Sequence, residues 1–132
     1  NVLGQDFFES KNEKHELKTA LGIKRSMGVN YLSMKKKYEK LIKRIVMKMF
    51  YYDVSSISSN KNKVAMIFYS SLEDGAETEG SMVILFDVAR NRYDILFGSD
   101  VDKYDEILLL DDYVYYSVGG YIFKYSILIF IW

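Results

Sequence analysis

The sequence predicts an α+β fold in which one or two N-terminal helices pack on a six-stranded antiparallel β-meander. Two observations predict it. Apolar residues recur at helical spacing over 33–50, and six β-branched or aromatic runs follow from residue 64 onward with no helical segment between them. The chain has 132 residues, 49% of them hydrophobic, which suits a single domain over 1–132. In this interpretation 1–54 is the basic helical part and 63–132 is the meander.

A first helix is predicted within residues 1–30, where Leu17, Ala20, Leu21 and Lys24 have helical spacing. The stronger prediction is a helix over 33–50, with Ser33 as its N-cap. Its apolar face is formed by Tyr38, Leu41, Ile42, Ile45, Val46 and Met49. Its opposite face is basic and carries Lys36, Lys37, Lys40, Lys43, Arg44 and Lys48. The helix is therefore amphipathic, and its apolar face is expected to cover the sheet.

The segment 55–63, SSISSNKNK, is typical of a linker or turn. After it the periodicity becomes that of strands, and the predicted strands are 64–70, 82–88, 93–97, 106–110, 113–118 and 121–131. The connections are too short for crossover helices, so the strands are expected to be antiparallel.

Gly119 and Gly120 lie between two aromatic runs and predict a type I′ hairpin, since this turn needs positive φ at both central residues. The register follows: Val118, Tyr116 and Val114 face Tyr121, Phe123 and Tyr125 on the core side, and Ser117 and Tyr115 face Ile122 and Lys124 on the other.

A second hairpin is predicted through 89–92. A two- or four-residue loop there would place Asp87 opposite Asp94, which is unfavourable. We therefore expect a three-residue loop with a bulge and with Asn91 in the left-handed region.

Residues 81–98, SMVILFDVARNRYDILFG, and 111–126, DDYVYYSVGGYIFKYS, resemble the blade repeats of β-propellers. In such blades an inner strand ending in aromatic-Asp-Val turns back into a strand ending in Leu-aromatic. The chain has strands for about one and a half blades, whereas a propeller needs about four or more. The resemblance therefore implies a lone propeller-like meander or part of a larger assembly, with scaffolding or recognition as its function and no catalytic residue.

The chain is a charge dipole. Residues 1–50 carry 12 Lys and Arg against 5 Asp and Glu, and residues 51–132 carry 6 against 13. The whole chain has a net charge of zero, which predicts no general attraction to nucleic acid or anionic membranes. Either the basic helix neutralises the acidic sheet, or one of the two surfaces faces a charged partner.

No catalytic signature is present. The chain has no cysteine and a single histidine, His15, which excludes cysteine nucleophiles and histidine-paired metal sites. Phosphate-binding glycine motifs do not occur. The loop with Asp100, Asp102, Asp105 and Glu106 alternates as calcium ligands would, but it lacks the glycine and distal glutamate of an EF-hand, which favours a solvated turn. We expect no cofactor and no metal, and these observations favour a non-enzymatic function over catalysis.

The leading functional hypothesis is a non-enzymatic module that binds a protein partner. One contact region is an acidic loop with Glu73, Asp74, Glu77 and Glu79. The other is a tyrosine-rich sheet face with Tyr113, Tyr115 and Lys124.

Two alternatives of other classes stay open. The six cations of the 33–50 helix would bind nucleic acid or lie on an anionic membrane surface. A carboxylate-based hydrolase would need two acids facing across a cleft.

The C-terminal run 125–132, YSILIFIW, is expected to be a central strand or an edge completed by a second copy of the chain. Its uninterrupted apolar stretch 127–132 is too short to span a bilayer.

Overall fold

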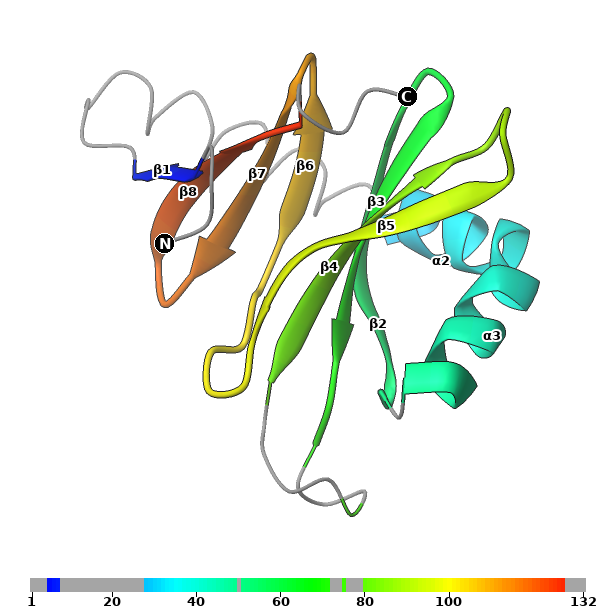
Figure 1. Ribbon diagram of the computed structural model, residues 1–132, viewed down its shortest axis with the longest axis horizontal. Helices are drawn as coiled ribbons and strands as arrows, with labels where there is room; N and C mark the ends of the chain where they lie inside the picture. Colours follow the sequence, from blue (N-terminus) through cyan, green and yellow to red (C-terminus); the bar gives the residue numbers. More distant parts are fainter. Residues whose placement is uncertain (1–4, 8–27, 50, 72–74, 76–79, 128–132) are drawn as a thin grey trace.

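The structure is a computed structural model that describes residues 5–7, 28–49, 51–71, 75 and 80–127. Two helices lie on one side of a four-stranded sheet, and a second sheet lies on its other side (Figure 1). The predicted combination of helices with antiparallel strands is confirmed. The predicted single six-stranded meander is wrong, because the strands divide between two sheets.

The central sheet has the strand order β2-β3-β4-β5, all antiparallel. Its strands are β2 (Asp53–Asn60), β3 (Lys63–Tyr69), β4 (Ser81–Asp87) and β5 (Arg92–Ser99). The second sheet has the order β1-β8-β7-β6. Its strands are β6 (Ile107–Leu110), β7 (Tyr113–Val118), β8 (Tyr121–Ser126) and the short β1 (Gln5–Phe7). The helices are α2 (Gly28–Lys37) and α3 (Glu39–Met49).

The central sheet is buried on both faces, and this is why the strands form two sheets. Residues 64–68 of β3 are all fully buried, and so is every residue of β4. Val64, Met66 and Phe68 pack against the helices, whereas Ala65 and Ile67 pack against the second sheet. A strand with no polar side needs cover on both faces. A single sheet with helices on one face would leave half of these side chains in water.

The segment 55–63, predicted as a linker or turn, instead contains most of β2. Ser56 and Ser58 are buried although they are polar. The Ser56 hydroxyl accepts the Ile107 N–H at 3.1 Å, and the Ser58 hydroxyl accepts the Leu109 N–H at 2.8 Å. These serines therefore join the edge of the central sheet to the edge of the second sheet. Their hydrogen bonds are non-local, and no turn signal in the sequence reveals them.

The helix predicted over 33–50 is two helices separated at Tyr38. Backbone bonds continue across the break, from Tyr38 N–H to Met34 O at 3.0 Å and from Ile42 N–H to Tyr38 O at 2.9 Å. The Tyr38 ring meets Phe86 edge-on, with ring centroids 6.3 Å apart. The prediction of Ser33 as N-cap is wrong, because Ser33 lies inside α2. The predicted apolar face is confirmed by the burial of Leu41, Ile42 and Ile45.

The hairpin at Gly119-Gly120 has the predicted turn and register. Both glycines have positive φ, 55° and 85°. Val118 pairs with Tyr121, Tyr116 with Phe123 and Val114 with Tyr125. Val114, Tyr116 and Tyr125 belong to the core between the sheets, as predicted.

The β4–β5 hairpin is only partly as predicted. Asn91 has a φ of 49°, in the left-handed region, and Asp87 avoids Asp94. The three-residue loop is wrong, because Asp87 pairs with Arg92 across a loop over 88–91. The bulge lies further along the strands, between Val83 and Ile84.

Asp87 holds this hairpin together. Its carboxylate lies 3.5 Å from Lys63 Nζ and accepts the Arg90 N–H at 3.1 Å. Burial by itself would raise the pKa of Asp87, but the Arg90 hydrogen bond and the Lys63 and Arg90 charges lower it below its usual value. The carboxylate is thus stabilised in its charged form.

Two sequence predictions lie outside the described residues. They are the helix around Leu17–Lys24 and the last four residues of the predicted strand 121–131. The described part of that strand, β8, lies between β7 and β1 and is therefore not an edge over 123–125.

Replacing Ser58 by Ala tests the hydrogen bonds that Ser56 and Ser58 make between the two sheets. The Leu109 N–H would lose its acceptor inside the protein, and we expect the free energy of unfolding to fall by about 1–3 kcal/mol. Urea denaturation monitored by circular dichroism measures this change. Ser59→Ala is the matched control, since the neighbouring Ser59 is exposed and should change stability by less than about 0.5 kcal/mol. Equal stability of the two variants would contradict the stabilising role of the hydrogen bond between Ser58 and Leu109.

Candidate functional site

A cleft of about 620 Å³ opens between α2, the start of β2 and the loop 100–106, and we call it the α2–β2 cleft. It is lined by Tyr31, Lys35, Asp53, Val54, Ser55, Tyr69, Lys103, Tyr104, Asp105 and Glu106. Its volume falls within the range of small-molecule sites, roughly 300–1,000 Å³. The cleft combines aromatic rings with charges of both signs.

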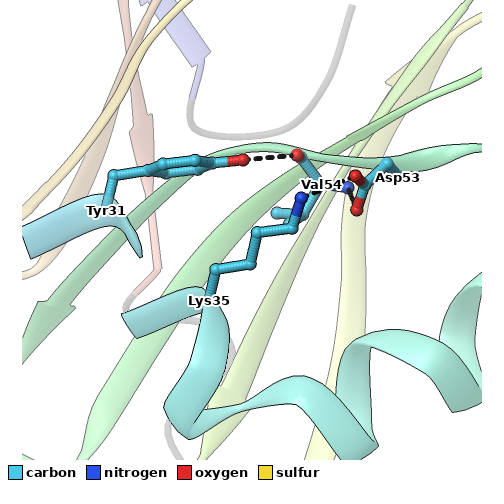
Figure 2. A network of polar contacts seen from close by, with 4 residues as sticks. All are labelled: Tyr31, Lys35, Asp53 and Val54. Carbon is cyan, nitrogen blue, oxygen red and sulfur yellow. Dashed lines mark hydrogen bonds and ion pairs between the residues drawn. The ribbon is translucent and has the colours of Figure 1, made fainter. Parts of the chain in front are cut away.

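One wall is fixed by two contacts between α2 and β2 (Figure 2). The Tyr31 hydroxyl donates to the Val54 carbonyl oxygen at 2.9 Å. The Lys35 ammonium binds the Asp53 carboxylate at 2.6 Å. The hydrogen bond from Lys35 to Asp53 raises the pKa of Lys35, against the opposing effect of burial. Both side chains project from successive turns of α2, and together they hold the helix against the strand.

A β-bulge lies in this wall. The register of β2 with β3 shifts between Val54 and Ser56, so Ser55 has no partner in the ladder. Ser55 is exposed and lines the cleft. The Asp53 carboxylate also accepts the Val54 N–H at 2.7 Å, which positions it at the start of the bulge. Bulges are over-represented beside functional sites because they redirect side chains.

The opposite wall is the loop 100–106, and Tyr104 anchors it. Its N–H donates to the Ser81 hydroxyl at 2.9 Å. Its ring packs against Phe97 and Tyr116, with centroids 5.7 Å and 5.1 Å away. Burial, and to a lesser degree the Asp102 charge, raises the pKa of Tyr104 to about 12. This wall is therefore attached to both sheets.

Each lysine of the cleft lies over a tyrosine ring. Lys103 Nζ is 5.7 Å from the centroid of Tyr69, and Lys35 Nζ is 5.9 Å from that of Tyr31. Both distances fall within the range of a cation–π interaction. Burial also raises the pKa of Tyr69, which keeps its ring neutral over the usual pH range.

The predicted tyrosine-rich contact residues do come together in the structure. Tyr113 and Tyr115 have ring centroids 6.1 Å apart, and Lys124 Nζ lies 4.7 Å from the Tyr113 ring. They occupy the side of the second sheet that faces away from the central sheet, which we call the outer face. Its residues on β6, β7 and β8 are Leu108, Leu110, Tyr113, Tyr115, Ser117, Ile122, Lys124 and Ser126.

The predicted basic residues all lie on the solvent side of the helices. These six, the basic helical face, are Lys36, Lys37, Lys40, Lys43, Arg44 and Lys48, and each is exposed. Lys43 pairs with Glu39 at 3.1 Å, at the i,i+4 spacing that favours such pairs on a helix. One alternative predicts that the basic helix and the acidic sheet neutralise each other. Among the described residues, Lys35–Asp53 is the only ion pair between them.

The predicted acidic contact residues Glu73, Asp74, Glu77 and Glu79 lie outside the described residues. The four acids of the loop 100–106 are described. In the described part of the chain, no three His, Asp or Glu side chains gather as metal ligands would.

The α2–β2 cleft was not predicted as a site. Of its lining residues, only Asp105 and Glu106 were considered, as calcium ligands. Tyr31, Asp53, Tyr69 and Lys103 come from four separate segments, and the sequence carries no local signal that they meet. Only the packing of α2 and the loop 100–106 around the bulge brings them together.

Comparisons with protein-family models, with curated proteins and with solved structures find no match to this chain. Among the described residues, neither helix has the length and apolar character needed to cross a membrane.

The raised pKa of Tyr104 gives a pH-dependent prediction. The folded state favours the neutral phenol, so its contribution to stability is fully present below pH 10 and is lost as pH rises toward about 12. We expect Tyr104→Phe to lose less stability over this interval than the wild-type protein. Urea denaturation at several pH values measures the difference. Tyr52→Phe, at an exposed tyrosine, is the control and should follow the wild type. If the stability of Tyr104→Phe depended on pH in the same way as that of the wild type, the raised pKa would not belong to Tyr104.

Proposed function

We propose that this chain is a non-enzymatic binding module that recognises a protein partner through the outer face. The observation that carries the proposal is the composition of that face. Tyr113, Tyr115 and Lys124 lie together, beside Leu110, which is 43% exposed. The acidic residues Glu73, Asp74, Glu77 and Glu79 belong to the proposal as a second contact region on account of their charge.

The outer face combines apolar and aromatic residues with Ser117, Lys124 and Ser126. The inner face of the same sheet packs on the central sheet through Ile107, Val114 and Tyr116. When one face of an antiparallel sheet is solvated, its residues are normally polar. Here Leu108, Tyr115 and Ile122 form an apolar cluster of their own, in which Ile122 is buried and Leu108 and Tyr115 are half-buried. A face with this composition supports a role in binding.

Its aromatic residues are of the type that dominates protein interfaces. Tyrosine is enriched among the residues that contribute most of the binding energy, because it buries a large rigid ring at a low entropic cost. Lys124 lies over the Tyr113 ring and adds a cation at the centre of the group. A partner with an apolar patch and a nearby carboxylate would complement this arrangement.

Removing both rings tests the proposal. In Tyr113→Ala/Tyr115→Ala we expect partner affinity to fall by roughly thirtyfold or more, which corresponds to about 2 kcal/mol. Partners are first captured on the immobilised wild-type protein, and their affinity is then measured by surface plasmon resonance. Tyr52→Ala is the control, since Tyr52 is an exposed tyrosine outside the outer face. An unchanged affinity in the double variant would refute the outer face as the contact surface.

Nucleic-acid binding by the basic helical face is a second candidate. The observation that favours it is that all six cations are exposed on one helical layer, while a single acid, Glu39, lies on the same helices. Such clusters of Lys and Arg bind phosphates by releasing counterions. A carboxylate-based hydrolase is not proposed, because the carboxylate anchored in the α2–β2 cleft, Asp53, is held in an ion pair with Lys35.

Charge reversal tests this candidate. The variant Lys40→Glu/Lys43→Glu/Arg44→Glu should abolish retention on heparin and should make the logarithmic salt slope of nucleic-acid binding shallower by about three. The control reverses the exposed Lys61, Arg92 and Lys103 to Glu, which changes the net charge equally but away from the helices. If both variants lose binding equally, net charge alone explains the attraction and the helical site is wrong.

A further inference from the structure

The α2–β2 cleft is built before any ligand arrives. Its two walls are attached independently, α2 by Tyr31 and Lys35 and the loop 100–106 by Tyr104. The bulge at Ser55 lies between them. A site whose walls are held by contacts within the protein loses little freedom when it binds, and this favours affinity for small groups.

The charges of the cleft favour a cation. Three carboxylates line it, from Asp53, Asp105 and Glu106, against two ammonium groups, from Lys35 and Lys103. Lys35 and Asp53 neutralise each other in a short ion pair. The two other lining carboxylates, on Asp105 and Glu106, come from the opposite wall, so an incoming cation meets acidic groups on the side away from the helix.

Lys103 indicates where such a cation would lie. Its side chain is exposed, and its ammonium lies over the Tyr69 ring at 5.7 Å. Tyr69 itself packs against Tyr52, with centroids 5.4 Å apart. The ring face of Tyr69 thus already accepts a positive charge, supplied by a flexible surface residue. A ligand cation that reached this ring would displace Lys103 at little cost, because exposed cation–π contacts are weak.

We propose that the α2–β2 cleft is a binding site for a cationic side chain or small amine, that is, a guanidinium or primary ammonium group. The cation lies on the Tyr69 ring and is held by the carboxylates of Asp105 and Glu106. The ring of Tyr104 closes the inner end of the site. This site is separate from the outer face and from the basic helical face, and it does not depend on either proposed function.

The test uses Nα-acetyl-arginine amide (below, arginine amide) as the probe and Nα-acetyl-citrulline amide (below, citrulline amide) as its uncharged isostere, followed by nuclear magnetic resonance on the full chain. Arginine amide should cause saturable shifts at Tyr69 and Tyr104, and citrulline amide should not. The peptide Gly-Arg-Gly distinguishes the sources of the cation: tighter binding of the peptide indicates a protein segment, and equal binding indicates a free amine. Equal shifts with citrulline amide, or no saturable shift, would overturn the proposal.

Two variants give effects of opposite sign. Lys103→Ala should tighten arginine amide binding by about two- to fivefold, the equivalent of one exposed cation–π contact, because it removes the competing cation. Asp105→Asn/Glu106→Gln should weaken it by about tenfold or more. Lys61→Ala, at an exposed lysine outside the cleft, is the control and should leave the affinity unchanged.

The effect of Lys103→Ala also distinguishes a cation site from an anion site. If the cleft bound an anion, Lys103 would contribute to binding and Lys103→Ala would weaken it. Inorganic phosphate serves as the probe for this comparison, and saturable shifts at Tyr69 with phosphate would refute the cation site. Melting curves show whether each variant is folded, and we expect no change for Lys103→Ala because its side chain is exposed.

Discussion

Burial of the central sheet on both faces is the constraint on which the rest of the structure depends. The interiors of β3 and β4 carry no polar residue on either side between Val64 and Phe68 or between Met82 and Phe86. The helices cover one face and the second sheet covers the other. Hydrophobic burial of this kind is the dominant favourable contribution to folding. This burial determines the order of the three layers, which are the helices, the central sheet and the second sheet. The order in turn determines which surfaces lie on the outside of the protein.

The candidate sites lie where the layers meet or end. The basic helical face is the solvent side of one outer layer, and the outer face is the far side of the other. The α2–β2 cleft lies at the junction of all three layers, where the bulge at Ser55 interrupts pairing between β2 and β3. The connection from β5 to β6 must pass from one sheet to the other at this point, and it supplies Lys103 to Glu106 to the cleft.

Local chemistry predicted the individual elements well. Gly119 and Gly120 specify a turn that only residues tolerant of positive φ adopt easily, and their register placed Tyr115 opposite Lys124 correctly. The helical spacing of Leu41, Ile42 and Ile45 identified the buried side of α3. The errors arose at Ser56 and Ser58, whose hydroxyls usually mark turns but here accept N–H groups from β6, 51 residues further along the chain.

The sequence by itself determined the strands β3 to β8, the glycine hairpin, the amphipathic helix and the grouping of Tyr113, Tyr115 and Lys124, because each follows from spacing along one element or across one turn. Only the tertiary structure decided that the strands form two sheets and that Tyr31, Lys35, Asp53 and Lys103 share a cleft. These features depend on contacts between segments far apart in the chain. Periodicity shows that a side chain will be buried, but it does not show which layer will bury it.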